Sequence, residues 1–557
     1  MSLAYKLWKI GGVLTEDDIK LSIKEEPTFK DGIEPVYMNI DFSFKVDKII
    51  SIGIKKEAIS KDKFFFSKKI GGTSNAFYLY PNITVLEDKP IEKITLLYNS
   101  LEYCTKYFCE DNSRKKIDSI LDEIQDIRAH SKMIVCQYEI EQNKEKLLNF
   151  NGEIKEQVKI EKLIKKYEEE LEEIISKRKN KVWNDLLLRA LSEIVKFQKA
   201  NYIIWLSIDG RTFYEDMPEV WTNWYKNPVE FDNLKDGYDI FTNEKSKIGY
   251  KTEVKVFSYD QYHDSLNFRL NENLPLSLSS ARQIKFAWIY IMENLVFYYK
   301  GLEYIIIPHL LTDDNSIFKL VIERLVQAKQ KTDSKKTILE KLKAEEKNLI
   351  NKIEKLKKKN SEYSKEEIEL RDVSQDIEIK DIGLIQELNE QVLSLEEHLN
   401  SVTLDYLFTS INRTNLSFEI KGTIEDVIPS KITDLVNQMR KNKINDLVKL
   451  GTKHIEETYL QDYFNRNELY FAVNKSSKNN ENSIFTERLH LAKLFLSDTK
   501  IKRNDLLKRF EFNRLYDYDH KKRIKKGIAE WIEYSSNFIK KENNIIEFLT
   551  KLNKIQE

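Results

Sequence analysis

Hydrophobic and polar residues alternate with two different periods in the first hundred positions. The spacing of Leu3, Leu7 and Trp8 is that of a helix, whereas every second residue from Val36 to Val46 is hydrophobic. A period of two indicates a half-buried β-strand, and the stretch KIISIGI that follows is its expected partner strand. The pattern predicts a mixed α+β domain over residues 1–100.

Two later segments carry the spacing of coiled coils. In residues 101–200 the apolar positions of one helix are Ile160, Ile164, Tyr167, Leu171 and Ile174. In residues 325–400 two arms are marked by Leu342, Leu349, Ile353 and Leu356, and by Ile385, Leu388, Val392, Leu395 and Leu399. Because the segment 358–380 between these arms is polar, we predict an antiparallel helical hairpin.

The remaining segments complete an α+β chain. The stretch YIIWLSIDGRTFYE predicts a strand with a hairpin turn at Asp209-Gly210, inside a strand-rich and aromatic-rich domain at 201–324. Residues 401–438 predict a short strand and a connector, with Ser430 as the N-cap of the next helix. Residues 439–557 predict a bundle that is helical throughout.

Composition adds one asymmetry to a neutral chain. The 557 residues contain 91 Lys and Arg and 91 Asp and Glu, so the net charge indicates no polyanionic partner. From Met439 to the last residue, however, 25 basic residues exceed 17 acidic ones. This surplus marks either a local surface for a polyanion or a solvated helical bundle.

The chain has no sequence feature of a secreted or membrane protein. Cys104, Cys109 and Cys136 do not form a disulfide framework or a zinc spacing, and we expect buried free thiols. No signal peptide is present, and the apolar run from Phe286 is interrupted by Glu293 and too short to span a bilayer. We therefore expect a cytoplasmic protein with no membrane partner.

No sequence motif for catalysis, a cofactor or a metal stands out. Walker A, Rossmann, HExxH, GxSxG and CxxC sequences are all missing. Arg514 and His520 have a spacing that resembles the motif of HEPN-type ribonucleases, but Leu515 follows the arginine where those enzymes carry a polar residue. An exposed polar helix face or turn explains YDYDH more simply. We expect a protein that is not an enzyme.

The stretch SKKIGGTSNAFYLYP is the first candidate for nucleic-acid contact. Glycines let a backbone approach a groove closely, and hydroxyl and amide groups can bond base edges or phosphates. A P-loop is excluded because no lysine follows the glycines. The alternative is a turn that joins two strands, and the aromatics after it are expected to anchor the next segment in the core. The candidate residues are Lys68, Lys69, Gly71, Gly72, Thr73, Ser74 and Asn75.

A second candidate is the basic run near the end of the chain. Ile524, Ile528 and Trp531 share one helix face, which leaves the neighbouring lysines on the solvent side. Clustered Lys and Arg suit sequence-independent contact with phosphates, and a solvated face is the alternative. The residues of this expected backbone track are Lys502, Arg503, Lys508, Arg509, Lys521, Lys522, Arg523, Lys525 and Lys526.

The order of five segments from Trp205 onward resembles a known family. These segments are LSIDGRTFYEDMPEV, LKDGYDIFTNEKSKIGY, VKVFSYDQYHDSLNF, ARQIKFAWIYIMENLVFYYKGLEYIIIPHLL and FEIKGTIEDVIPSKITDLV. Their series is similar to the large-subunit protein of type I-B CRISPR surveillance complexes (Cascade). Many members carry two Cys-x-x-Cys pairs near DGYDIFTNEKSK and RQIKFAWIYIM, where this chain has no cysteine. We expect that packed side chains here replace a structural zinc.

The resemblance implies a non-catalytic role in antiviral defence. Such a subunit recognises the protospacer-adjacent motif (PAM) in duplex target DNA, aids duplex opening and assists recruitment of a helicase-nuclease. Its implied partners are the guide RNA (crRNA), the target double-stranded DNA, the backbone and small subunits, and the helicase-nuclease. The C-terminal region resembles the small subunit, so we hypothesise that translation from Met439 yields a separate short protein. An unchanged short product after Met439→Leu would contradict this. A coiled-coil scaffold that binds no nucleic acid is the remaining alternative.

Overall fold

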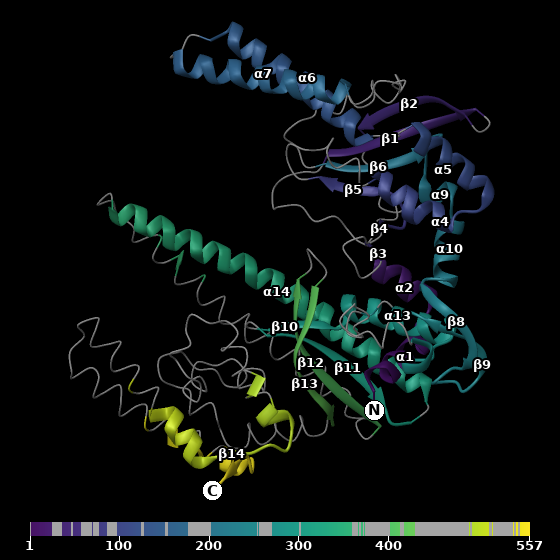
Figure 1. Cartoon of the computed structure of the whole chain (residues 1–557). Coiled ribbons are helices and arrows are strands. Elements are labelled where there is room, and N and C mark those ends of the chain that lie inside the picture. Colours follow the sequence, from purple (N-terminus) through teal and green to yellow (C-terminus); the bar gives the residue numbers. More distant parts are fainter. Residues whose placement is uncertain are drawn as a thin grey trace. The chain divides into compact units, whose positions relative to one another are not determined.

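The computed structural model (Figure 1) divides into two compact units, each built from separate stretches of the chain. The first unit comprises Met1–Leu14, Val254–Ser258 and Phe286–Glu557, and the second comprises Thr15–Glu253 and Tyr259–Lys285. The structure describes residues 2–24, 36–45, 48–56, 69–70, 77–85, 97–123, 127–150, 154–176, 202–252, 254, 270–299, 302–312, 314–358, 366, 369–370, 373, 401–412, 417–428, 489–490, 493–511, 515, 539, 542–543, 546–547 and 549–557.

The second unit contains a mixed sheet in the order β2-β1-β6-β5, with β7 paired to β6. Strands β1 and β6 are parallel, whereas β2 is antiparallel to β1 and β5 is antiparallel to β6. The strands are β1 (Val36–Lys45), β2 (Lys48–Lys56), β5 (Asn82–Val85), β6 (Tyr202–Ile208) and β7 (Arg211–Thr212). The predicted strand at Val36 and its partner KIISIGI are therefore confirmed.

Strand β1 is buried more completely than its alternating pattern predicts. Met38, Ile40 and Phe42 are buried as expected, but the intervening Asn39 and Asp41 are only 4% and 7% exposed. The expectation of a half-buried strand is wrong for this central part, because β1 lies between β2 and β6 in the sheet. The buried carboxylate of Asp41 has hydrogen-bond partners in and after β6, and these are described with the candidate site.

The predicted turn after β6 is confirmed. Asp209 and Gly210 have φ values of +49° and +76°, and they connect the antiparallel strands β6 and β7. Positive φ at both central positions is the geometry that Asp-Gly favours in a two-residue hairpin. The turn is held further because the amide of Phe44 donates to Asp209 Oδ1 at 2.8 Å.

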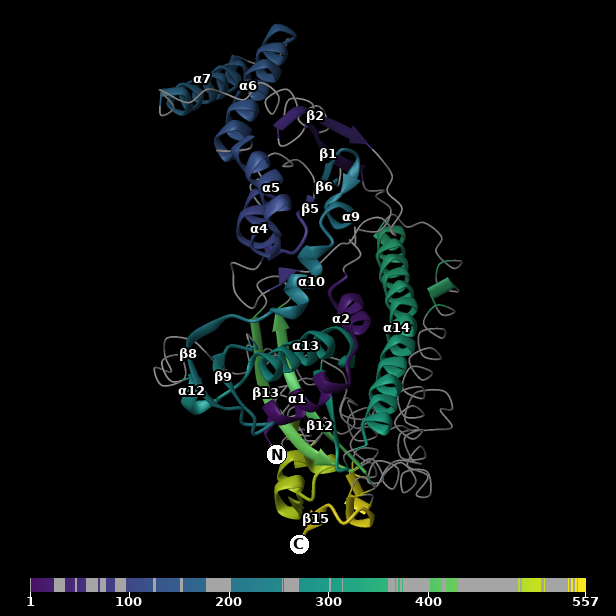
Figure 2. The same ribbon diagram turned by 90° about the vertical axis from the view of Figure 1, so that its right-hand side faces the viewer.

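The second unit also contains helices before, between and after these strands. They are α2 (Glu16–Ile23), the π-helix η1 (Leu101–Thr105), α4 (Lys106–Phe108), α5 (Asp111–Glu123), α6 (Ile127–Leu148), α7 (Ile154–Ser176), α9 (Phe213–Asp216), α10 (Glu219–Lys226) and α12 (Leu270–Asn273). Helices α6 and α7 lie side by side as one arm, as Figure 1 and Figure 2 show. Ile164 of the predicted apolar seam is buried, which confirms the helix expected there.

Two further hairpins belong to the second unit. Strands β3 (Lys69–Ile70) and β4 (Phe77–Tyr78) form one antiparallel pair, and β8 (Phe231–Tyr238) and β9 (Lys245–Tyr250) form another. The chain then enters α13 (Leu278–Asn294), whose last residues belong to the first unit.

The first unit is built on an antiparallel sheet in the order β10-β11-β12-β13. Its strands are β10 (Val296–Tyr299), β11 (Leu302–Leu310), β12 (Val402–Asn412) and β13 (Ser417–Val427), and its long helices are α1 (Leu3–Val13) and α14 (Asn315–Lys358). Leu7 and Ile10 of α1 are buried, and α1 contacts both β11 and α14. The predicted opening helix is confirmed, and β13 is longer than the short strand expected there.

Of the helical hairpin predicted at 325–400, the structure describes the first arm. Helix α14 contains that arm, and Leu349 and Ile353 are buried as the heptad spacing predicts. The apolar positions of the second arm, Ile385 to Leu399, lie outside the described residues, as does Ser430.

The C-terminal region departs from an all-helical bundle. Residues 503–511 are helical, but β14 (Ile501–Lys502) pairs in parallel with β15 (Ile555–Gln556). The expectation of helix throughout 439–557 is therefore wrong at these two short strands. Such two-residue pairings are too short to produce an alternating pattern in the sequence. Among the described helices, none is long and apolar enough to cross a membrane.

Candidate nucleic-acid interface

The glycine-rich candidate loop lies at the end of a β-hairpin. Lys69 pairs with Tyr78 and Ile70 with Phe77, so residues 71–76 connect β3 to β4. Lys69 is therefore the one candidate that lies in a strand. The others, Lys68, Gly71, Gly72, Thr73, Ser74 and Asn75, lie outside the described residues. The alternative of a strand-connecting turn agrees with this pairing, and contact with DNA stays a prediction.

Tyr80 anchors the hairpin in the core. Its side chain is 2% exposed, and its hydroxyl donates to the carbonyl of Met217 and accepts from the amide of Trp221, each at 3.1 Å. Burial raises the pKa of Tyr80, so the phenol keeps the proton that it donates. The ring also meets Tyr214 edge to face at 5.5 Å. For Tyr80, the expectation that the aromatics after the glycines anchor the chain is confirmed.

The π-helix η1 packs against this hairpin and holds the residue that follows β4. The buried hydroxyl of Thr105 donates to the carbonyl of Leu79 at 3.0 Å, and η1 contacts β4 directly. Single π-turns are rare and occur frequently at functional sites. The chain directly after β4 is therefore held by the hydrogen bonds of the buried Tyr80 and by the contact with η1.

Sequence analysis missed two exposed tyrosines on this same helical segment. Tyr103 in η1 is 61% exposed and Tyr107 in α4 is 72% exposed, although both rings are large. A separation of four residues places both on one face of the helical turn. Exposed aromatic rings near a nucleic-acid surface provide stacking platforms for unpaired bases. Their spacing was visible in the sequence, but their exposure was not.

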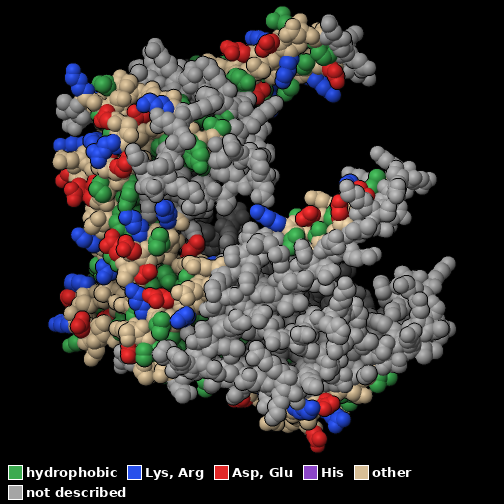
Figure 3. Space-filling model, turned by 180° about the vertical axis from the view of Figure 1, so that it is seen from behind, with side chains coloured by type: hydrophobic (Ala, Val, Ile, Leu, Met, Phe, Trp, Pro, Cys, Tyr) green, Lys and Arg blue, Asp and Glu red, His purple; other side chains and the backbone are tan. Residues whose placement is uncertain are grey.

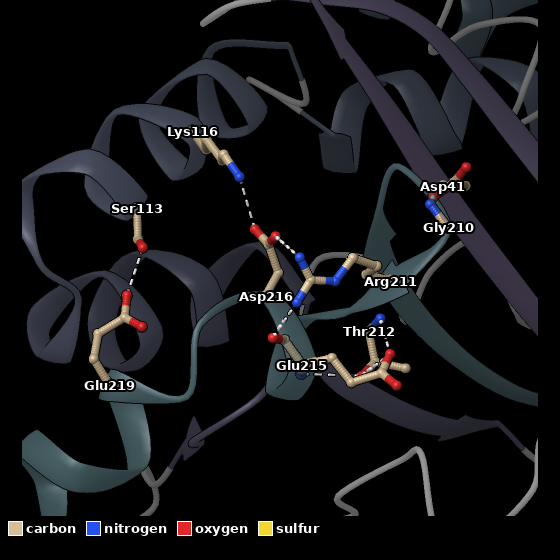
Figure 4. Close-up of polar contacts among 9 residues, drawn as sticks. All are labelled: Asp41, Ser113, Lys116, Gly210, Arg211, Thr212, Glu215, Asp216 and Glu219. Atoms are coloured by element: carbon tan, nitrogen blue, oxygen red, sulfur yellow. Dashed lines mark hydrogen bonds and ion pairs between the residues drawn. The ribbon is translucent and has the colours of Figure 1, made fainter.

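Two cations near the β6–β7 turn lie against the carboxylate of Asp216 (Figure 4). The Nζ of Lys116 lies 2.8 Å from Asp216 Oδ2, and the guanidinium of Arg211 lies 3.6 Å from Asp216 Oδ1. Arg211 also donates to the carbonyl of Glu215 at 2.8 Å. The Arg211 side chain nevertheless stays 61% exposed, so its outer face is open to a phosphate.

The turn that precedes Arg211 is held by hydrogen bonds to Asp41. Its Oδ1 accepts from the amide of Gly210 at 2.9 Å and from the hydroxyl of Ser207. Thr212 begins α9 with a capping box that Glu215 completes. A buried carboxylate and a helix cap thus fix the backbone on both sides of Arg211 (Figure 4).

The C-terminal basic cluster is described only in its first part. Lys502, Arg503 and Lys508 are exposed, whereas Arg509 is half-buried. Leu506 and Phe510 of the helix at 503–511 are buried, so this helix is amphipathic. The helix face predicted from Ile524, Ile528 and Trp531 lies outside the described residues. The other predicted track residues, Lys521, Lys522, Arg523, Lys525 and Lys526, lie outside the described residues, as do Arg514 and His520.

Charge is mixed on the described part of the face that Figure 3 presents. Figure 3 shows Lys and Arg side chains interspersed with Asp and Glu on the face that it presents, without one continuous basic area. The three cysteines are free and buried, as expected, and burial raises the pKa of Cys104 to about 12. Burial also raises the pKa of Cys109, so neither Cys104 nor Cys109 is an activated thiolate.

A buried carboxylate in the first of the two stretches where the resemblance implies a lost zinc site is bonded to Ser277, shortly before the second stretch. Asp239 is 2% exposed, and it accepts from the amides of Ser277 at 2.7 Å, Phe241 at 2.9 Å and Thr242 at 3.1 Å. Burial alone would raise the pKa of this carboxyl, but the backbone donors outweigh burial and lower the pKa. Hydrogen bonding thus joins the β8–β9 turn to the start of α13. We expected apolar packing to do this.

Comparison with known proteins identifies one family over part of the chain. Residues 240–427 match the model of the central domain of the CRISPR-associated protein TM1802. The matched segment includes β9, α14 and the strands of the first unit's sheet. No curated protein matches the chain. The family match supports a CRISPR-associated (Cas) protein.

Proposed function

We propose that this chain is the non-catalytic large subunit of a type I-B CRISPR RNA-guided effector complex in the cytoplasm. In this role it recognises the PAM in duplex target DNA, aids opening of the duplex and helps to recruit the helicase-nuclease. The guide RNA reads the rest of the target by base pairing, so the protein needs to read only a short duplex segment and the backbone.

The observation that carries this proposal is the match to the CRISPR-associated central domain over residues 240–427. It agrees with the order of segments that resembles the large subunit, and it extends across the end of the second unit and much of the first. The match alone supports a Cas protein, and the role within the complex is our inference.

The geometry of the second unit supports contact with nucleic acid. The β3–β4 hairpin joins its strands through six residues, among them Thr73, Ser74 and Asn75, whose side chains suit base edges and phosphates. Tyr80 and Thr105 hold the base of that hairpin. Mixed surface charge favours local contacts of this kind over a broad non-specific surface.

Purification of the chain with its operon partners tests the proposal. We expect a guide-length RNA to accompany the protein, and we expect target duplexes with randomised flanks to be recovered with one short flanking sequence enriched. A complex that contains no RNA would favour a scaffold instead. Cleavage of RNA that disappears with Arg514→Ala would favour a HEPN-like ribonuclease.

A further inference from the structure

A cavity of about 370 Å³ opens between the β8–β9 hairpin and the start of α13 in the second unit. Asp239 fixes its position, since the carboxylate joins the turn to Ser277. The amides of Gly249 and Tyr250 donate to the carbonyl of Leu276 at 3.2 and 3.4 Å, which holds the other side. The cavity is lined by Thr242, Glu244, Ser246, Lys247, Tyr250, Ser277, Leu278, Ser279 and Arg282.

The lining suits an anion that accepts hydrogen bonds. Arg282 and Lys247 contribute two cations against the single carboxylate of Glu244. Arg282 lies over the ring of Tyr225, with 5.9 Å between the guanidinium and the ring centroid, which orients its charge. Lys247 is 3.0 Å from Asp236, but both side chains are more than half exposed, and such pairs exchange partners at little cost.

Four Ser and Thr side chains line the same space, and the hydroxyl of one of them has no partner among the described residues. The buried Oγ of Ser246 has no hydrogen-bond partner within the described part of the chain. Buried polar atoms are almost always satisfied, so an orphan beside a cavity indicates a missing partner. The amide of Ser277, just before α13, already donates to Asp239. The anion site therefore does not depend on the N-terminus of α13 alone.

Aromatic rings at one end of the cavity indicate which anion it takes. Tyr250 lines the space, and its ring meets Phe231 edge to face at 5.8 Å. Phe231 is 59% exposed, so one of its faces is open to solvent. A cation, hydroxyl groups and an exposed ring within one short span match the phosphate, sugar and base of a nucleotide.

We propose that this cavity binds a backbone phosphate of a single nucleic-acid strand, with the adjoining base near Phe231. The assignment rests on the proposed function, because a protein that opens a duplex must hold an unpaired strand. Arg282 binds the phosphate oxygens, and the Ser246 hydroxyl donates to one of them.

Fluorescence anisotropy of the full chain with labelled dT20 tests the site. We expect Arg282→Gln to weaken binding about tenfold, as for loss of one charge-assisted hydrogen bond. The slope of log affinity against log salt should fall by about 0.7, the value for one phosphate of a single strand. Ser246→Ala, which removes no hydrogen bond in the described structure, should weaken binding several-fold. The matched control is Lys245→Gln, an exposed lysine of β9 that does not line the cavity.

The outcomes separate this site from the proposed function. If dT20 binds and Arg282→Gln, Ser246→Ala and Lys245→Gln all retain parental affinity, the cavity proposal is wrong and the proposed function stands. Calorimetry with inorganic pyrophosphate is the second measurement. Binding of pyrophosphate that is lost in Arg282→Gln, without any binding of dT20 or guide RNA, would overturn the nucleic-acid assignment and the proposed function. Absence of binding to both ligands would overturn the anion site itself.

Discussion

The ammonium of Lys6 lies 2.6 Å from the carboxylate of Asp405, across 399 positions of sequence. Lys6 is buried in α1, and it also meets Asp426 at 3.2 Å. Burial alone would lower the pKa of Lys6, but the hydrogen bonds and charges of the two aspartates outweigh burial and raise the pKa. This pair joins α1 to strand β12, and the two residues are 399 positions apart in the sequence.

Loss of this pair should release α1 from its unit. Lys6→Met leaves the buried carboxylate of Asp405 without its counter-ion, although the amide of Asp426 still donates to it, and we expect a loss of about 3–5 kcal/mol. Hydrogen exchange of the α1 amides in the full chain measures it. Asp426→Asn is the control, since that side chain is 57% exposed and its loss should cost far less. Unchanged protection of α1 in Lys6→Met would contradict a stabilising role.

The carboxyl of Asp239 should make stability depend on pH in the acid range. Its pKa is lowered in the folded chain, so its contribution is complete above the unfolded pKa of about 3.9 and is lost as the pH falls through the folded value. We expect the urea midpoints of the parent and Asp239→Asn to approach each other as the pH is lowered through the range below about 3.9. A difference between the two urea midpoints that stays constant over that range would mean that Asp239 stabilises the fold through packing and not through its charge.

Tyr80→Phe should destabilise the second unit without changing its shape. The substitution leaves the Trp221 amide without its partner in the core, which costs about 1–3 kcal/mol, whereas the Met217 carbonyl still accepts from the amide of Val220. Denaturant unfolding of the full chain measures the loss. Tyr107→Phe is the matched control, because that side chain is 72% exposed and surface changes stay within about 0.5 kcal/mol. Equal stability of the two variants would contradict the role of Tyr80 in holding the chain in the core.

The loop and the basic cluster should affect DNA binding differently. Alanine at Thr73, Ser74 and Asn75 together should change or abolish PAM preference while binding to random duplex persists. Charge reversal at Lys522, Lys525 and Lys526 should weaken binding and flatten its salt slope without a change in PAM preference. Selection from a randomised flank library and salt titrations distinguish the two. If the loop variant keeps the parental PAM preference, the β3–β4 loop is a turn that does not read DNA.

Tyr103 and Tyr107 should contribute to binding of unpaired strands. Serine at both positions removes two stacking surfaces, each worth about 1–3 kcal/mol per base. We expect the affinity for single-stranded DNA to fall by tenfold or more, with little effect on duplex. Leu148→Ser, at an 87% exposed position of α6, controls for loss of exposed apolar surface. Equal losses for single strands and duplex would indicate a folding defect.

Local patterns predicted the elements of this chain well. The strand predicted from Val36, the Asp209-Gly210 turn and the helix predicted from the seam of α7 depend on neighbours within a few residues, and all three are confirmed. The same patterns could not predict that Asn39 and Asp41 are buried, because that depends on which strands flank β1. They also could not find the parallel pairing of β14 with β15, whose members lie about 50 positions apart.

For the candidate site, the sequence by itself determined the chemistry of the glycine-rich loop, the basic cluster and the aromatic residues after the loop. Residue type and local period are properties of short windows, and they persist whatever the rest of the chain does. Only the tertiary structure decided that Tyr80 is buried while Tyr103 and Tyr107 are exposed. It also decided that Arg282 and Ser246 line one cavity, and that Lys6 meets Asp405. Burial and pairing of this kind depend on which distant segments pack together, and no short window contains both partners.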